Sequence, residues 1–264
     1  MSVIDLTITN HVATLVIRSA AARNAIDIHA VREMHNALDE IKKAGSGVRA
    51  LVITGSDGVF CSGVDLHSVD LETPDGRQQA HAELRRFMDP LVLRFGELQY
   101  PIVAAVNGAA VGAGMSLALV SDIIVMAEEA YLWPSFARLG VVPDAGVTAR
   151  LARRIGGGRA LSSLLLAEKI HAKTALEWGL VYSVVPSADV LNAAQAVAHR
   201  LAAGPRSVIA QIRQLSASAF DNSLSEQLRA ERTAQERVLD AHECFEGVRA
   251  FFEKRDPNFL PRRE

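Results

Sequence analysis

The sequence predicts an α/β fold followed by a helical C-terminal region. Short apolar, strand-like runs alternate with helical patterns along most of the chain, which is typical of layered α/β proteins. Beyond Pro186 the β-branched runs give way to long helical patterns that are rich in Glu and Arg. We therefore expect a core domain over residues 1–195 and a helical C-terminal region over residues 196–264.

The first predicted elements are a hairpin, a helix and a buried strand. Residues 3–9 and 12–17 are β-rich and surround a two-residue turn, which favours an opening hairpin. In the helix that follows, Asp27 can cap the first turn and Gly45 can end the last one. The next apolar run, Ala50 to Thr54, predicts a buried strand.

A polar stretch separates this strand from the rest of the core. It runs from His67 to Gln79, and we expect it to be mobile. We expect a helix at 80–98 to follow, kinked or split by Pro90. The remaining core elements are predicted as strands at 101–106, 123–127 and 181–185, and a glycine-rich turn with a helix at 107–120. The predicted tail helices are 188–203, 206–217, 224–239 and 243–255.

Composition and charge exclude several classes of function. The 264 residues are 49% hydrophobic and 22% charged with a net charge of −2, so the chain lacks the basic surface that nucleic-acid binding needs. The N-terminus has no signal-peptide pattern, and the apolar runs are shorter than the roughly 20 residues of a membrane span. Cys61 and Cys244 lack CxxC spacing, so we expect free thiols in a cytoplasmic protein.

The first segment that suggests chemistry is Phe60-Cys61-Ser62-Gly63-Val64-Asp65-Leu66, which directly follows a predicted strand and its turn. Gly63 allows a sharp bend that leaves the next N–H free to point at a ligand. Taken alone, the segment is better explained by a turn followed by a short helix capped by Ser62.

The second segment, Asn107 to Leu117, is rich in Gly and Ala and joins a strand to a helix. The unpaired N–H groups of a helix's first turn suit an oxyanion. A dinucleotide fingerprint fits poorly because Leu117 stands where its third glycine is needed, and no GK[ST] motif is present. A nucleophile elbow at Ser116 lacks its last glycine and a histidine marked as its base.

The third segment, Trp133 to Gly146, places Asp144 among apolar residues. One interpretation is that Asp144 caps the helix that runs through Leu151 and Ile155. The other is a carboxylate in an apolar wall, where desolvation raises the pKa and yields a useful base.

Together and in this order, the three segments resemble the enoyl-CoA hydratase/isomerase (crotonase) superfamily. The resemblance runs from Arg23-Asn24-Ala25 to Phe252-Glu253-Lys254-Arg255-Asp256-Pro257 and includes Ala167-Glu168-Lys169-Ile170 and Trp178-Gly179-Leu180-Val181. It implies a spiral of ββα units with a C-terminal helical region that trimerises, so we expect a homotrimer or a hexamer.

The resemblance also implies an acyl-CoA site. Its oxyanion hole would consist of the N–H groups of Val64 and Ala113. We expect no metal and no cofactor, because coenzyme A enters as part of the acyl-CoA substrate. The residues that the resemblance places along the CoA path are Arg23, Ser62, Asp65 and Leu66, and Phe252 and Lys254 would reach the CoA of a neighbouring subunit.

The sequence departs from the hydratases of this family at their two catalytic glutamates. Ser116 and Phe136 stand at those positions, where they would line the acyl site without moving a proton. Asp144 falls where several isomerases of the family, and a dehalogenase branch, carry an aspartate. The resemblance therefore favours a 3-enoyl-CoA to 2-enoyl-CoA isomerase, with Asp144 as the base.

Two other functions stay open at this point. A hydratase or lyase of the same superfamily could act through other groups. A non-catalytic acyl-CoA-binding protein would also explain the loss of both glutamates. A dehalogenase lacks a clear supporting histidine, because His67 and His81 lie in the polar region.

Overall fold

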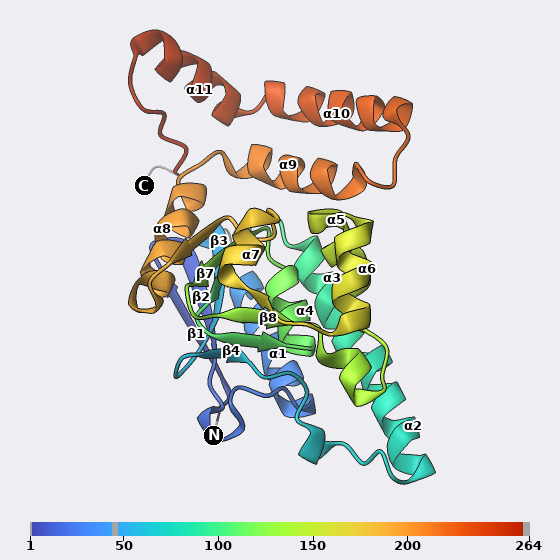
Figure 1. The fold of residues 1–264 in the computed structure, drawn as a ribbon. Helices are drawn as coiled ribbons and strands as arrows, with labels where there is room; N and C mark the ends of the chain where they lie inside the picture. Colours follow the sequence, from blue (N-terminus) through green and yellow to red (C-terminus); the bar gives the residue numbers. More distant parts are fainter. Residues whose placement is uncertain (1, 44–46, 261–264) are drawn as a thin grey trace.

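The computed structural model describes residues 2–43 and 47–260, and two sheets form its centre (Figure 1). The six-stranded sheet has the order β1-β2-β3-β5-β7-β10, and the four-stranded sheet has the order β4-β6-β8-β9. Among the strand pairs of the described residues, only β1/β2 and β8/β9 are antiparallel. The strands of the large sheet are β1 (Ile4–Thr9), β2 (Val12–Ile17), β3 (Ala50–Gly55), β5 (Ile102–Val106), β7 (Ile123–Ala127) and β10 (Ser183–Val185).

The small sheet arises because consecutive strands alternate between the two sheets. β3 is followed by β4 (Val59–Cys61), β5 by β6 (Ala109–Val111), and β7 by β8 (Tyr131–Trp133). Helices follow each pair, so the chain forms repeated ββα turns, and the predicted α/β spiral is confirmed. β9 (Ile170–His171) completes the small sheet.

The middle of the large sheet is covered on both faces. Every residue of β3 and β5 is buried, which explains their continuous apolar sequences. Helix α8 (Val190–Ala202) packs on β3, β5 and β7, and β4 of the small sheet contacts β3 and β5. The buried face of α8 is made of small or branched residues: Val190, Ala194, Ala198 and Ala202.

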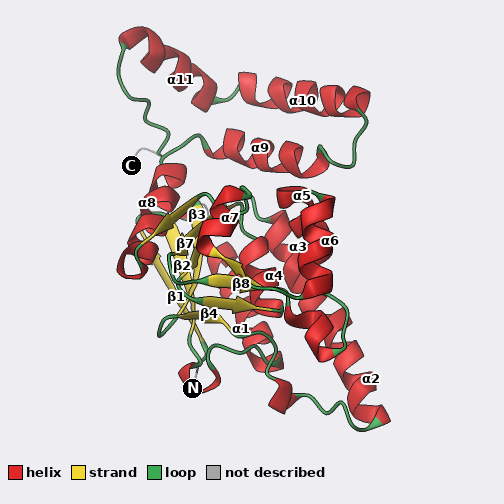
Figure 2. Cartoon of the chain, in the orientation of Figure 1, coloured by secondary structure: helices red, strands yellow, loops and turns green. Residues whose placement is uncertain are grey.

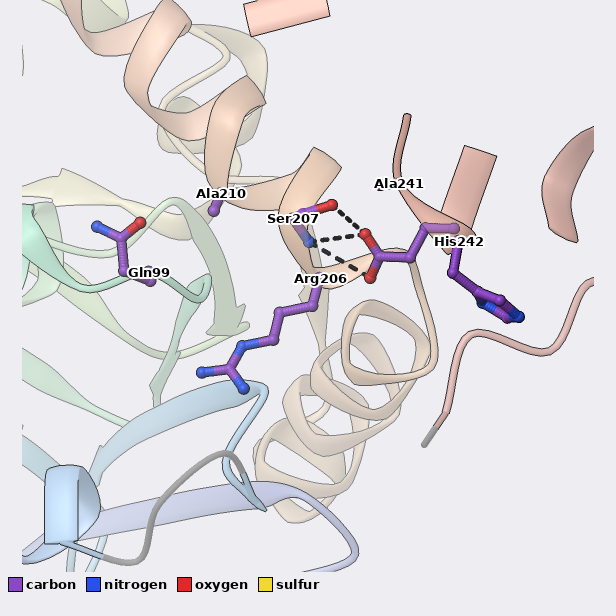
Figure 3. A pocket seen from close by; sticks show the side chains of 7 residues that line it. Gln99, Arg206, Ser207, Ala210, Ala241 and His242 are labelled. Atoms are coloured by element: carbon purple, nitrogen blue, oxygen red, sulfur yellow. Dashed lines mark hydrogen bonds between the residues drawn. The ribbon is translucent and has the colours of Figure 1, made fainter. Parts of the chain in front are cut away.

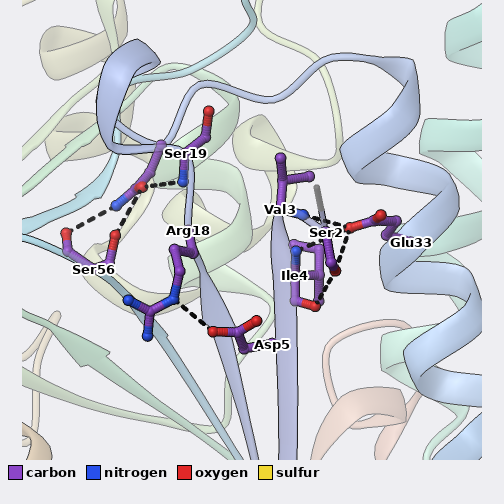
Figure 4. A network of polar contacts seen from close by, with 9 residues as sticks. Ser2, Val3, Ile4, Asp5, Arg18, Ser19, Glu33 and Ser56 are labelled. Carbon is purple, nitrogen blue, oxygen red and sulfur yellow. Dashed lines mark hydrogen bonds and ion pairs between the residues drawn. The ribbon is translucent and has the colours of Figure 1, made fainter.

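The N-terminal hairpin and helix α1 (Ile28–Lys43) form as predicted. Both turn residues of the hairpin, Asn10 and His11, have positive φ, as a two-residue turn between twisted strands requires. Asp27 Oδ1 accepts the N–H of Ala30 at 2.7 Å and caps α1. Glu33 on α1 accepts the N–H groups of Val3 and Ile4, which ties β1 to the helix (Figure 4). Gly45, the predicted end of α1, lies outside the described residues.

The polar stretch contains a helix that we did not predict. Helix α2 (Pro74–Glu83) begins inside it, because the Thr73 hydroxyl accepts the N–H of Gly76 and Pro74 occupies the first turn. A π-helical segment, Leu84–Met88, then separates α2 from α3 (Asp89–Glu97). The predicted break near Pro90 is therefore present, but it is a π segment that ends just before Asp89.

The core continues with short helices between the strands. The strand predicted at 181–185 begins only at Ser183, and the helix predicted at 107–120 starts at Ala113, because 109–111 form β6. The remaining elements here are α4 (Ala113–Leu119), the 3-10 helix η5 (Ser135–Leu139), α5 (Val147–Ile155), α6 (Gly157–Leu166) and α7 (Ala172–Glu177).

The C-terminal helices extend away from the core (Figures 1 and 2). They are α9 (Arg206–Ser218), α10 (Leu224–Leu239) and α11 (His242–Glu253). Residue 195, where we predict the domain boundary, lies inside α8, whose end is held by Arg49 through the carbonyls of Ala202 and Gly204, each at 2.6 Å. Across the described residues, none of the helices has the length and apolar character that crossing a membrane requires.

Candidate active site

Two glycine turns lie next to each other at the beginning of α4. Gly63 and Gly112 both have positive φ, 102° and 51°, and each directly precedes a residue of the predicted oxyanion hole, Val64 or Ala113. A side-chain carbon placed on Gly63 would lie 3.0 Å from the carbonyl oxygen of Val111 and 4.0 Å from the amide nitrogen of Ala113. The fold thus brings together two turns that are far apart in the sequence.

The main-chain N–H groups after these glycines are not used by the fold. Ile26 pairs with the first segment through the carbonyl of Gly63 and the N–H of Asp65, which leaves out the N–H of Val64. Ala113 is the first residue of α4, so its N–H has no carbonyl one turn earlier to bond. In the described part of the chain, neither N–H donates a hydrogen bond to another backbone group.

A buried asparagine holds the turn around Gly63 in place. Asn24, only 1% exposed, accepts the N–H of Ser19 at 2.8 Å and donates to the carbonyls of Ser56 and Val59 at 3.0 and 2.7 Å. Ser19 and Ser56 are both seen at this network in Figure 4. Because Val59 begins β4, the amide of Asn24 links the 19–26 loop to the strand that leads into Gly63.

We expect Asn24→Ala to lower the free energy of unfolding by roughly 2–4 kcal/mol, because buried partners would be left unpaired. Chemical denaturation measures this. Asn10→Ala is the matched control, since Asn10 has the same left-handed backbone in an exposed turn. It should cost at most about 1 kcal/mol. Equal losses in the two variants would show that the hydrogen bonds of Asn24 contribute little.

Ser62 does not cap a helix, which corrects one of our interpretations. Its hydroxyl donates to the carbonyl of Ala22 at 3.2 Å, and its N–H donates to the carbonyl of Arg23 at the same distance. The cap of the short 3-10 helix Leu66–Ser68 is Asp65, whose side chain accepts the N–H of His67. The predicted CoA residues therefore lie on two adjoining segments of the chain: Arg23 on one, and Ser62, Asp65 and Leu66 on the other.

Asp144 precedes α5 but does not cap it. The N-cap of α5 is Gly146, without a side-chain hydrogen bond, and Val147 donates instead to the main-chain carbonyl of Asp144 at 3.1 Å. The N-cap interpretation is therefore wrong. In the described structure, Asp144 Oδ1 is buried and has no hydrogen-bond partner. Since α5 packs against α4, this carboxyl group lies on the segment that adjoins the helix of Ala113.

The surroundings of Asp144 favour its protonated form. Burial, followed by the negative charge of Asp89, raises the pKa of the Asp144 carboxyl above its usual range. Asp89 is the first residue of α3, and sequence reasoning missed it. No pattern in the sequence could have found it, because the pairing depends on how α3 lies against the loop before α5.

Ser116 and Phe136 are buried and cannot provide a carboxylate. The Ser116 hydroxyl donates to the carbonyl of Gly112 at 3.3 Å, so it is bonded within its own helix instead of being presented as a nucleophile. Phe136 belongs to η5, which lies beside the second glycine turn: a side-chain carbon on Gly112 would be 3.6 Å from Ser135 Oγ.

Phe252 and Lys254 lie apart from these residues within one chain. Phe252 is on α11 and Lys254 follows it, at the far end of the tail from α4 (Figure 1). Phe252 is 78% exposed. The structure of a single chain therefore does not bring them to Val64, Ala113 or Asp144.

Two hollows lie elsewhere on the chain. One of about 450 Å³ lies where the tail meets Gln99 of the core, and there the carboxylate of Glu243 accepts the N–H of Ser207 at 3.1 Å (Figure 3). The other, of about 400 Å³, lies at the ends of β2 and β3 beside Asn107 and Ser187. Neither is lined by Val64, Ala113 or Asp144. Over residues 2–43 and 47–260, no cluster of three or more His, Cys, Asp or Glu side chains could hold a metal ion.

The spiral fold, the paired glycine turns and the helical tail define the class of crotonase-like acyl-CoA enzymes. The family model for enoyl-CoA hydratase/isomerase matches residues 7–262, and the chain belongs to this family.

Individual relatives agree with this assignment. The chain is 37% identical to the 1,2-epoxyphenylacetyl-CoA isomerase of Escherichia coli, over 86% of this chain and 88% of that protein. It is also 37% identical to a "probable enoyl-CoA hydratase" of Rhodobacter capsulatus, over 86% and 87% of the two chains. The crystal structure of an enoyl-CoA hydratase from Bacillus anthracis superposes with a TM-score of 0.90 at 28% identity, over 98% and 99% of the chains.

Proposed function

We propose that this enzyme moves a double bond in an acyl-CoA thioester, converting a 3-enoyl-CoA into the 2-enoyl-CoA. Asp144 removes a proton from C2, and the electrons of that C–H bond form a dienolate on the thioester. The same carboxyl group then returns the proton at C4, so the double bond moves from C3–C4 to C2–C3. No other reactant is consumed, and Asp144 ends in the form in which it began.

The two glycine turns support the first half of this mechanism. In the proposal, the N–H groups of Val64 and Ala113 hold the thioester oxygen as it becomes negative. Each well-placed donor of this kind lowers the barrier by about 2.7–4 kcal/mol. Because both donors belong to the main chain and neither bonds another backbone group, they can be directed at a ligand without breaking the fold.

The buried carboxylate oxygen of Asp144 is the observation that carries the proposal. An unpartnered oxygen away from water is costly to the folded protein unless it serves a ligand or a reaction. Its raised pKa makes it a stronger base than an exposed aspartate, and proton transfer is most efficient when the pKa of the base lies near the working pH.

Hydration of an enoyl-CoA is the second candidate, and the name of the Rhodobacter capsulatus relative favours it. It needs one group to activate water and another to protonate the α-carbon. Ser116, bonded to its own helix, and the buried Phe136 cannot act in these roles as carboxylates do. A non-catalytic acyl-CoA-binding protein would also have Ser116 and Phe136 at these positions. It would, however, gain nothing from the desolvated carboxyl group of Asp144.

Parallel assays separate these functions. The protein is incubated with trans-3-enoyl-CoA, and conjugation of the double bond with the thioester is followed by ultraviolet absorbance. Crotonyl-CoA hydration and conversion of 1,2-epoxyphenylacetyl-CoA, the substrate in the name of the Escherichia coli relative, are measured on the same preparation. Faster conjugation than hydration supports the proposal. Turnover of crotonyl-CoA alone would assign a hydratase, and thioester binding without turnover would assign a binder.

We also propose that the chain forms a homotrimer or hexamer, in which Phe252 and Lys254 reach a neighbour's CoA. The tail exposes several large apolar side chains, which favours burial against another subunit. They include Phe220 (64% exposed), Leu224 (76%), Phe251 and Phe252 (both 78%). Light scattering should therefore return three or six times the chain mass of 28.4 kDa. A single-chain mass at micromolar concentration would contradict the assembly.

We also propose a cytoplasmic location, because the cysteines carry free thiols. Cys61 is buried and Cys244 partly buried, and both are free thiols. Burial raises the pKa of the Cys61 thiol to about 12, so it is unreactive at neutral pH.

A further inference from the structure

Helix α3 runs along the segment that carries Asp144. A side-chain carbon on Gly146 would lie 4.0 Å from Val92 Cγ1, and one on Gly96 would lie 3.9 Å from Arg150 Nη2. Val92 therefore faces Gly146, and the last turn of α3 faces Arg150. Since residues three and four apart lie on one side of a helix, Asp89 precedes Val92 on this same side, at the end next to Asp144.

We propose that Asp89 is a positioning carboxylate of this site, and that its negative charge makes Asp144 a stronger base in the reaction. This inference rests on the proposed function of Asp144. Asp89 touches no reacting atom in the proposal; it acts only through the second carboxyl group. On its own segment Asp144 is followed by the buried Ala145 and Val147, and α3 contributes a like charge.

Two exposed arginines, Arg86 and Arg85, lie three and four residues before Asp89, and the described basic groups near them contact Phe87. Arg32 of α1 lies 4.8 Å from the centre of the Phe87 ring, and Arg86 lies 5.4 Å from the same ring. The Nε2 atom of His35 is 3.0 Å from the carbonyl oxygen of Phe87, and its other ring nitrogen contacts Arg94. These groups are held at Phe87 and Arg94 and not at Asp144.

The α5 side of the site also lacks a partner for Asp144. Arg138 and Arg150 are equally near along the chain, but Arg138 lies over the Trp133 ring at 5.6 Å and the electrostatic partner of Arg150 is Asp122. Helix α4 carries no ionisable side chain, and Arg159 of α6 stacks on Trp178 at 5.6 Å. Within the described residues, the negative charge of Asp89 adds to burial in raising the pKa of Asp144.

The sign of the effect follows from like-charge repulsion. An ionised Asp89 disfavours ionisation of Asp144, so the pKa of Asp144 is higher with Asp89 than without it. Activity requires the ionised base and falls as pH drops through this pKa. Because Asp89 is exposed to solvent, its field is screened, and removing the charge should shift the acid limb of the pH profile down by only about half a pH unit.

The test is the pH dependence of kcat/KM for trans-3-enoyl-CoA in the wild type and in Asp89→Asn, each at low and at high salt. The acid limb of Asp89→Asn should lie at lower pH, and kcat/KM on the plateau should fall about twofold or less, because the base is weaker. Raising the salt to about 1 M should move the wild-type limb toward that of the variant, which should itself barely respond.

Two further variants serve as controls. Asp89→Glu keeps the negative charge, so the acid limb of its pH profile should lie close to that of the wild type. Glu97→Gln removes one negative charge from the opposite end of the same helix and should leave the profile unchanged. An Asp89→Asn limb that coincides with the wild type would overturn the proposal. If that variant does not fold, a wild-type limb that is insensitive to salt would overturn it as well.

A readout without turnover separates this inference from the proposed function. The carboxyl carbon of Asp144, assigned by its absence in Asp144→Asn, can be titrated by NMR in labelled protein. If the wild type does not isomerise 3-enoyl-CoA but the Asp144 titration has a lower midpoint in Asp89→Asn, the electrostatic coupling of the two carboxyl groups is supported and the proposed isomerisation is refuted. An unchanged midpoint in an active isomerase would refute the coupling alone.

Discussion

Replacing Asp144 with asparagine is expected to abolish isomerisation while leaving CoA-thioester binding nearly unchanged. The amide has the same shape as the carboxyl group but cannot accept the C2 proton, so kcat/KM should fall by about 10³–10⁴-fold, to the background rate. The dissociation constant of a non-reactive acyl-CoA should change by less than about threefold, because the proposed contacts with CoA come from other residues. Steady-state kinetics and calorimetry measure the two quantities.

Asp240→Asn is the matched control, since it makes the same chemical change at an exposed position that ends α10. It should keep wild-type kinetics. An Asp144→Asn enzyme that retains more than a few per cent of its turnover would remove this residue from the mechanism. A loss of binding equal to the loss of activity would instead indicate a misfolded site.

The same substitution should raise stability, and the sign can be derived from ionisation. The pKa of Asp144 is higher in the folded than in the unfolded chain, so folding favours the protonated form. That stabilisation is complete below the unfolded pKa and is lost as pH rises through the folded pKa. Asparagine cannot ionise, so the Asp144→Asn variant keeps this stabilisation at every pH. Its melting temperature should therefore be higher than that of the wild type at neutral pH and equal to it in acid.

The long strands of the large sheet could be predicted because burial leaves a local trace. β3 and β5 are covered on both faces, so all of their residues are apolar or small, and such runs are visible in the sequence. The strands of the small sheet are only two or three residues long. Their pairing partners are far apart in the chain, and no periodicity can develop over so short a span.

In the polar stretch, the sequence pattern missed the start of a helix that the structure contains. Thr73 and Pro74 form a standard helix start, but the many polar residues that follow gave the segment the composition of a loop. The assignment of a cap to Ser62 failed for a similar reason. A serine before a short helix is a typical cap, yet the carbonyl of Ala22, brought close by the turn at Asn24, takes its hydroxyl instead.

The candidate site was predictable where it depends on backbone conformation. The glycines before Val64 and Ala113 are visible in the sequence, and both have the positive φ that such turns require. Asp144 was visible as a carboxylate among apolar residues. The electrostatic role of Asp89 was not, because it arises only when α3 packs along the segment from Asp144 to Arg150.

Replacing Gly114 with alanine is expected to have the second large effect. Gly114 follows Ala113 in α4, and a side-chain carbon there would lie 2.3 Å from the carbonyl oxygen of Cys61 and 2.8 Å from its Cβ. Both contacts are too short, so α4 must move away from the turn that carries Val64. We expect kcat to fall by about 10²–10³-fold, as when one oxyanion donor is lost. The free energy of unfolding should fall by about 1–3 kcal/mol.

Gly158→Ala is the control, because a side-chain carbon at this position of α6 would meet nothing within 4 Å. It should keep full activity and gain up to about 1 kcal/mol of stability from the better helix former. The comparison matters because both proposed donors are main-chain groups, which substitutions at Val64 or Ala113 themselves would leave in place. Only a displaced backbone can test them, so a Gly114→Ala enzyme with wild-type kcat would show that the spacing of the two turns does not control the reaction.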